Sequence, residues 1–232
     1  MSLFSYLNDP QQLLILVCIR LLIIFTVLPI HEYAHAYAAH KMGDETAYMN
    51  GRMTLNPIAH LDIFGAIFLL LFGFGWAKPV PVNPRNFRNY KRGTAITAAA
   101  GPISNLLCAA IGMFFLRIIN YIPVCIAITE TTYNVLYYVF LAVYYFVTVN
   151  LSLAIFNLIP IPPLDGSRIL SAYAPYKVNA WLARYQRYIY IGFMLLLFTG
   201  ILSTPMNWLI NIFYRGLYYL FFWVELIMKA IF

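Results

Sequence analysis

The stretch LLILVCIRLLIIFTVLPIHEYAH, residues 13–35, decides the fold of this chain and points to its chemistry. Its apolar part, residues 13–30, has the length and composition of a membrane-spanning helix. His31 and His35 are four residues apart and therefore lie on one face of a helix, about one turn apart. Two imidazoles so placed can hold one zinc ion, with Glu32 as a general base. A hydrolytic metal motif in a membrane helix implies cleavage inside or at the edge of the bilayer.

The composition is that of a polytopic membrane protein. Hydrophobic residues make up 62% of the 232 residues and charged residues only 10%, whereas about a quarter of an ordinary soluble domain is charged. The net charge of +7 comes from basic residues in short loops between apolar segments. This pattern favours contact with the lipid bilayer over nucleic-acid binding, so we expect no nucleic-acid partner. Arg20 lies within the first apolar segment, and the sequence identifies no partner for it.

Five apolar segments are long enough to span a bilayer, which takes roughly 20 residues. They predict an all-α polytopic membrane protein in which residues 1–232 form a single membrane-embedded peptidase domain. Its core would cover residues 13–168, and a C-terminal helix pair would cover residues 181–229. The predicted spans are residues 13–40, 93–119, 132–158, 181–202 and 206–229.

Between the first two spans the sequence changes character. Asn50-Gly51 separates two short strand-like runs, residues 46–49 and 52–56, and this arrangement is the strongest short-range signal for a β-hairpin. Residues 62–76, DIFGAIFLLLFGFGW, contain an apolar stretch that is too short and too glycine-rich for a regular span. We therefore expect a membrane-associated β-hairpin followed by a re-entrant segment; the alternative is a short sixth span.

The basic residues predict the orientation, because Lys and Arg favour cytoplasmic loops. They cluster in residues 77–92 and near the loop between the third and fourth spans, whereas the first twelve residues contain none. With residues 62–76 re-entrant, all these clusters fall on the cytoplasmic side of the cell membrane and the N-terminus lies outside. A true span there would put residues 77–92 out of register with Lys41. The same topology places HEYAH and Asp165 at the cytoplasmic ends of their helices.

A catalytic zinc usually takes three protein ligands and keeps a fourth position for water, so a third ligand is needed. Asp165 is the only acidic residue between Glu130 and Glu225. It lies in NLIPIPPLDG (Asn157–Gly166), whose prolines exclude a regular helix. Broken backbone at membrane depth is tolerated mainly where it lines a cavity or is buried in protein. Asp165 is therefore the candidate third ligand; the alternative is an ordinary turn at a helix end.

Three separated motifs together resemble the site-2 protease family of intramembrane zinc metalloproteases, most closely its small bacterial and archaeal members without PDZ or CBS domains. The motifs are HEYAH (31–35), AAAGPISN (98–105) and FNLIPIPPLDGSR (156–168). The resemblance covers roughly residues 25–170 and implies hydrolysis of peptide bonds within or near transmembrane segments of membrane proteins. One departure is Ser167, where the family often has a second glycine.

The resemblance also implies roles for individual residues. His31, His35 and Asp165 would bind one Zn²⁺ per chain, and Glu32 would activate water as the catalytic base. Asn157 would act on the substrate, binding it or polarising its carbonyl.

Further substrate contacts are implied at two places. Asn105 would lie near the site. The expected hairpin would pair with an extended substrate as a β-strand. Its central residues are Asn50, Gly51, Arg52, Met53 and Thr54.

A second class of function is a non-enzymatic metal-binding or metal-transporting membrane protein. Many transporters contain paired inverted halves with interrupted helices, and the sequence has no such symmetry. Transport also leaves the position of Glu32 between the histidines unexplained. An inactive relative that only binds membrane peptides is disfavoured by the intact set of metal ligands. The physiological substrate and the oligomeric state are not specified by the sequence.

Overall fold

A computed structural model describes residues 8–72, 75–125 and 129–231. Over these residues the chain is helical and contains no β-strand. The first helix, α1 (Pro10–Leu22), continues through a π-helical turn, η2 (Ile23–Val27), into α2 (Leu28–Met42). Pro29 accounts for the π turn, because it has no N–H to donate to the carbonyl one turn earlier. The other helices are α3 (Thr46–Met49), α4 (Pro57–His60), α5 (Ile63–Phe72), η3 (Pro84–Asn86), α6 (Tyr90–Cys125), α7 (Glu130–Asn157), α8 (Asp165–Tyr173), α9 (Tyr176–Thr199), α10 (Ser203–Leu220) and α11 (Phe222–Ile231).

Three helices of the described chain are long and apolar enough to cross a membrane. They are Pro10–Met42, Tyr90–Ile122 and Glu130–Asn157, and they coincide with the first three predicted spans. The predicted fourth span falls on α9. The predicted fifth span, residues 206–229, is divided between α10 and α11, which meet at Phe221. A count of five or six spans therefore stays a prediction.

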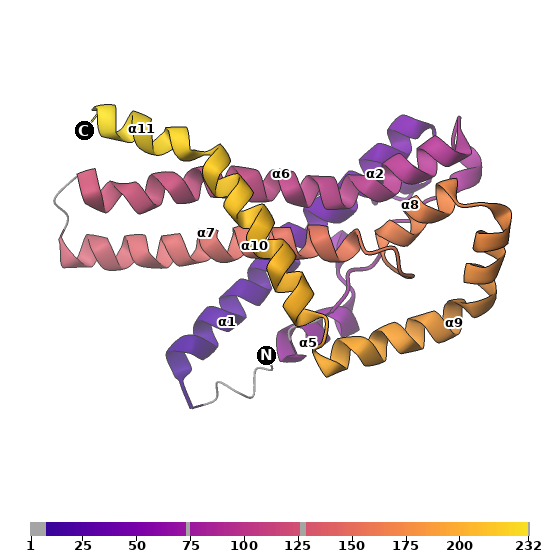
Figure 1. Ribbon diagram of the computed structural model, residues 1–232, viewed down its shortest axis with the longest axis horizontal. Coiled ribbons are helices and arrows are strands. Elements are labelled where there is room, and N and C mark those ends of the chain that lie inside the picture. The colour runs from indigo at the N-terminus through magenta and orange to yellow at the C-terminus, as the bar shows by residue number, and fades with distance from the viewer. Residues whose placement is uncertain (1–7, 73–74, 126–128, 232) are drawn as a thin grey trace.

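Helices α6 and α7 form the centre of the molecule (Figure 1), lying side by side and antiparallel. Gly112 permits their close approach, because a Cβ there would lie 2.8 Å from Cγ2 of Val147. Met113 and Leu151 are fully buried between them. Helix α10 crosses this pair and packs Tyr214 against the same core, while α2 packs on α6.

An ion pair within the membrane-spanning region joins α11 to α6. The guanidinium of Arg117, which is buried, lies 2.6 Å from the carboxylate of Glu225. The Tyr218 ring covers the same guanidinium, 3.9 Å from the ring centroid. Because an unpaired charge is costly at membrane depth, this contact fixes the C-terminal helix on the central pair.

The predicted β-hairpin over residues 46–56 was wrong. Residues 46–49 form the single helical turn α3, and the Asn50 side chain donates a 2.7 Å hydrogen bond to the Thr46 carbonyl. Gly51 follows with a φ of 64°. Asp44 explains why a helical turn forms here rather than a strand. Its carboxylate accepts a hydrogen bond from the backbone N–H of Thr46, which is then not free to pair with a neighbouring strand.

An extended segment, residues 77–82, runs beside α2 instead. The N–H of Lys78 donates to the carbonyl of His60 at 2.9 Å, and the N–H of Asn83 donates to the Asp44 carboxylate at 2.7 Å. Both ends of the segment are therefore anchored to the turns that follow α2.

Asp44 is the main anchor of this region. Its carboxylate also accepts a 2.8 Å hydrogen bond from the Asn86 amide. Burial alone would raise the pKa of the Asp44 carboxyl, but the hydrogen bonds from Thr46, Asn83 and Asn86 hold that pKa below its usual range.

Helix α5 is short, and the chain folds back along it. Its 10 residues extend about 15 Å. A Cβ at Gly75 would lie 2.1 Å from the carbonyl oxygen of Gly65, so the returning backbone touches the start of α5. The Arg20 guanidinium donates to the carbonyl of Leu70 near the other end of α5, which gives this arginine of α1 a structural role. Residues 73–74 of the expected re-entrant segment lie outside the described residues.

Candidate active site

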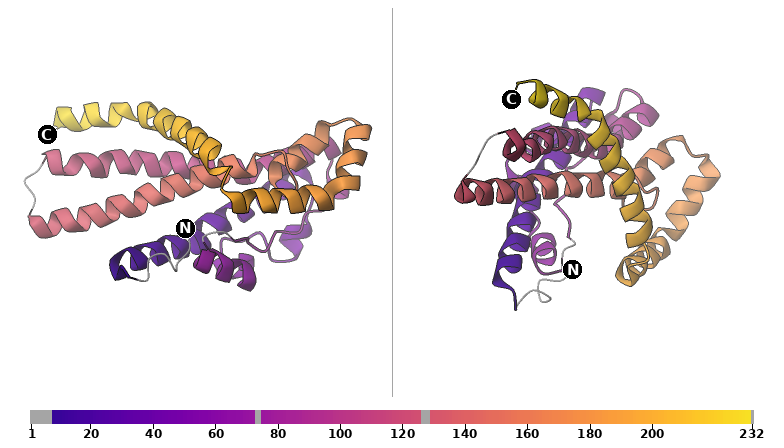
Figure 2. Two further views of the ribbon diagram at one scale, coloured as in Figure 1. Left: turned by 60° about the horizontal axis from the view of Figure 1, so that its bottom comes forward. Right: turned by 60° about the vertical axis from the view of Figure 1, so that its left-hand side comes forward.

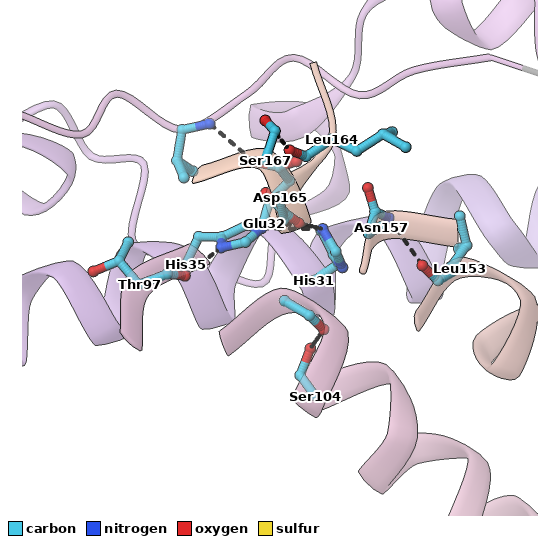
Figure 3. Close-up of polar contacts among 12 residues, drawn as sticks. His31, Glu32, His35, Thr97, Ser104, Leu153, Asn157, Leu164, Asp165 and Ser167 are labelled. Atoms are coloured by element: carbon cyan, nitrogen blue, oxygen red, sulfur yellow. Dashed lines mark hydrogen bonds and ion pairs between the residues drawn. The ribbon is translucent and has the colours of Figure 1, made fainter. Parts of the chain in front are cut away.

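Three buried side chains converge where α2 meets the start of α8 (Figure 3). His31 and His35 come from α2, and Asp165 is the first residue of α8. The two Nε2 atoms lie 3.0 Å apart, and Oδ2 of Asp165 lies 3.3 Å and 3.2 Å from them. Ligands about 2.0–2.1 Å from a tetrahedral zinc ion lie about 3.3 Å from one another. The triangle of donor atoms therefore has the size that a zinc ion requires.

The chemistry of these donors also fits a metal. Oδ2 of Asp165 is buried and faces Nε2 of both histidines at 3.3 Å and 3.2 Å, so its neighbours there are the two imidazoles, each able to bind a metal. Nδ1 of His35 lies 2.7 Å from the carbonyl of Thr97. If Nδ1 carries the proton and donates it to that carbonyl, the Nε2 lone pair is free for a metal.

The Asp165 carboxyl is kept in its anionic form by its neighbours. Burial by itself would raise its pKa, but hydrogen bonds and charge from His31 and His35 hold the pKa below its usual range. Gly166 allows the carboxylate to reach this position, because a Cβ there would lie 2.3 Å from the carbonyl oxygen of Leu158. The turn after α7 therefore closes tightly on the start of α8.

A cleft of about 390 Å³ opens over the three donors. Glu32 and Asn157 both line it, as does the extended segment 77–82. Oε2 of Glu32 accepts a 2.9 Å hydrogen bond from the N–H of Val80, so the extended segment holds the expected base. The Asn157 amide donates to the carbonyl of Leu153 at 3.0 Å. Since an amide nitrogen has two N–H groups, one of them is left for the cleft.

Gly101, in the AAAGPISN motif, sets how closely α6 approaches the two histidines of α2. A Cβ at this position would lie 2.4 Å from Nε2 of His35 and 2.5 Å from Cε1 of His31. Asn105 lies one turn further along α6, is fully buried and does not line the cleft. The structure therefore assigns the close contact within this motif to its glycine.

The predicted substrate residues 50–54 do not line the cleft. Arg52 instead donates hydrogen bonds to the carbonyls of Lys78 and Pro79, at 2.7 Å and 3.3 Å, and so helps to hold the backbone of the extended segment in place. Val80 was missed by the sequence interpretation. A local feature could have drawn attention to it, because it is the only residue in Pro79-Val80-Pro81 with a backbone N–H.

Comparisons with known proteins agree with this geometry. The profile of Peptidase family M50 matches residues 19–199. A candidate zinc metalloprotease of Bacillus subtilis, YwhC, is 41% identical over 84% of this chain and 85% of its own length. The candidate zinc metalloprotease Rip2 of Mycobacterium tuberculosis is 27% identical over 81% of this chain and 68% of its own length. No solved structure shows a significant match.

Proposed function

Because this chain belongs to Peptidase family M50, as its resemblance to the site-2 proteases predicted, we infer that it is an intramembrane zinc metalloprotease. The observation that carries the proposal is the triangle of donor atoms beneath the cleft. We assign one zinc ion to His31, His35 and Asp165. Glu32, which lines the same cleft, is the general base.

A zinc ion held by His31, His35 and Asp165 would supply Lewis-acid chemistry, lowering the pKa of a water and polarising the scissile carbonyl. Glu32 would accept the proton of the attacking water and deliver it to the leaving amine. The Val80 N–H orients the carboxylate by holding Oε2, which leaves the other oxygen to exchange the proton. The remaining N–H of Asn157 donates to the substrate carbonyl oxygen as negative charge develops on it.

The chain is a multi-pass membrane protein, and we propose that it lies in the cell membrane with its N-terminus outside and its active site toward the cytoplasm. The basic residues of loop 77–92 support this orientation. The fold-back at Gly65 and Gly75 supports a re-entrant α5, because the chain returns to the start of that helix. Helix α9 would then be the fourth span, and α10 together with α11 would be the fifth.

The proposed substrates are transmembrane segments of other membrane proteins. A helical segment hides its carbonyl groups in its own hydrogen bonds and must unwind before hydrolysis. The cleft, with the extended segment 77–82 as one wall, has room for a short unwound stretch.

The test is cleavage of a panel of single-span peptides in proteoliposomes, with zinc content measured on the same samples. We expect Glu32→Gln to retain zinc and lose cleavage, because only the base is removed. His31→Ala should lose both. Zinc in the wild type with no cleavage of any peptide would favour the metal-binding or transport alternative. Cleavage by Glu32→Gln at the wild-type rate would contradict the role of the base.

A further inference from the structure

Helix α9 is loosely attached to the rest of the described chain. Among its described side chains only Phe193 is buried, and its ring lies 5.8 Å from that of Phe156 on α7. Figures 1 and 2 show α9 apart from the central pair of helices, α6 and α7.

The exposed residues of α9 change in character along the helix. Residues 176–190 carry the exposed aromatic and basic side chains, with Val178 among them, and exposed aliphatic side chains follow at residues 191 and 195. Such an order is typical of a helix that passes from the lipid headgroups toward the acyl chains. The large exposed residues are Tyr176, Trp181, Tyr185, Tyr188 and Tyr190, followed by Ile191 and Leu195.

Two adjoining cavities, of about 440 Å³ and about 410 Å³, lie between α9 and the Pro162-Pro163 turn. The larger reaches α8 and is lined by Ser167, Ser171 and Asn179. The two hydroxyl groups donate to the carbonyls of Leu164 and Arg168, and the Asn179 amide donates to the carbonyls of Ser171 and Ala174. Oδ1 of Asn179 is buried and has no hydrogen-bond partner among the described residues, so this lining leaves one acceptor unused.

The cavities are positively charged. Arg168 lines the larger one, Arg184 and Arg187 line the smaller one, and no acidic residue lines either. The sequence contains no acid between Asp165 and Glu225, and none of these arginines takes part in an ion pair of the described chain. Uncompensated guanidinium groups around a concave site attract anions and suit the geometry of phosphate.

We propose that this double cavity binds the headgroup of an anionic phospholipid. Arg184 and Arg187 contact the phosphate, and the Asn179 amide accepts a hydrogen bond from a headgroup hydroxyl. A lipid is favoured over free phosphate because the exposed aliphatic side chains of Ile191 and Leu195 continue the site along α9, where acyl chains can lie.

The site adjoins the catalytic cleft. Pro163 and Arg168 line the larger cavity and the cleft as well. A bound headgroup would therefore hold in place the turn that carries Asp165, and anionic lipid should raise the rate of cleavage.

The test measures binding of phosphatidylglycerol to the purified, full-length protein by native mass spectrometry. The variant Arg184→Gln/Arg187→Gln removes both cations of the smaller cavity. Each cation near an anionic surface contributes about fivefold to binding, so we expect lipid affinity to fall about 25-fold. The matched control is Lys177→Gln/Arg92→Gln, which removes the same charge from exposed residues that line neither cavity. The control should bind lipid within about twofold of the wild type.

Three results would overturn the proposal. Equal loss in both variants would mean diffuse attraction to the surface, and displacement of the lipid by millimolar inorganic phosphate would mean a free-phosphate site. The third result is measured in purely zwitterionic vesicles. If the Arg184→Gln/Arg187→Gln variant still bound lipid but no longer cleaved an acidic peptide, the two arginines would form a substrate site. Lipid binding is measured without proteolysis, so a protein that binds lipid and cleaves nothing would contradict only the proposed function.

Discussion

Replacing Gly101 with alanine tests how closely α6 must approach the proposed metal ligands His31 and His35. The new Cβ would lie 2.4 Å from Nε2 of His35, whereas ordinary van der Waals contact begins at 3.4 Å. Either the imidazole or the helix must therefore move by about 1 Å, several times the tolerance of about 0.2 Å for metal–ligand distances. Disturbing the support of a metal ligand typically costs 10–100-fold in metal affinity.

We expect Gly101→Ala to bind zinc at least about tenfold more weakly and to cleave about 100-fold more slowly, because a 1 Å misplacement at a catalytic site can cost that much. The backbone itself should not suffer, since alanine favours a helix over glycine by roughly 1 kcal/mol. Zinc affinity is measured by chelator competition, cleavage with a single-span peptide, and helix content by circular dichroism.

The matched control is Gly216→Ala in α10, where a Cβ would meet no atom within 4 Å. It should keep zinc affinity and activity. Wild-type zinc binding and cleavage by Gly101→Ala would show that a methyl group fits beside the histidines, contrary to the contacts at Gly101. Equal losses in both variants would show that the effect is not specific to the metal site.

Three further predictions follow from hydrogen bonds and ion pairs. Val80→Pro removes the N–H that orients Glu32, and we expect kcat to fall at least about tenfold with zinc content unchanged; an unchanged kcat would contradict the orienting role. Asp44→Asn should lower the free energy of unfolding by about 1–3 kcal/mol at neutral pH. Because the pKa of Asp44 is lower in the folded protein than in the unfolded one, this stabilisation is present above about pH 4 and is lost as the pH falls through the folded pKa. If the unfolding temperatures of the wild type and Asp44→Asn differed by the same amount at every pH, this prediction would be wrong. Glu225→Gln leaves the Arg117 charge buried and should destabilise by about 3–5 kcal/mol, whereas replacing both residues with apolar ones should cost less; thermal unfolding of both variants decides this.

The convergence of His31, His35 and Asp165 could be predicted because each residue's place depends on a short-range rule. Helical spacing alone places His31 and His35 on one face, and Asp165 is the only acid beside a proline-broken segment at the same depth. The structure brings these three together. The roles of Gly101 and Val80 were not predictable, because each acts on a residue more than forty positions away.

The hairpin prediction failed for a local reason. Asn50-Gly51 does form a turn, but the turn signal does not determine what lies on either side of it. The Asp44 carboxylate accepts a hydrogen bond from the backbone N–H of Thr46, and a helical turn begins at that residue. The extended segment beside the cleft is 77–82 instead, and its position depends on long-range hydrogen bonds.

Apolar runs predicted the first three spans because membrane helices depend on composition over about 20 residues. The same criterion could not show that residues 206–229 break at Phe221, since both halves are apolar. Nor could it find the partner of Arg20, because Leu70 reaches this arginine only after α5 folds against α1.

X-ray absorption at the zinc edge of the purified protein shows whether two histidines and one aspartate hold a zinc ion. We expect one zinc ion per chain, with nitrogen and oxygen ligands at about 2.0–2.2 Å and no sulfur. Asp165→Ala should change this spectrum. A site with sulfur ligands near about 2.3 Å, or a spectrum that Asp165→Ala leaves unchanged, would contradict this ligand set.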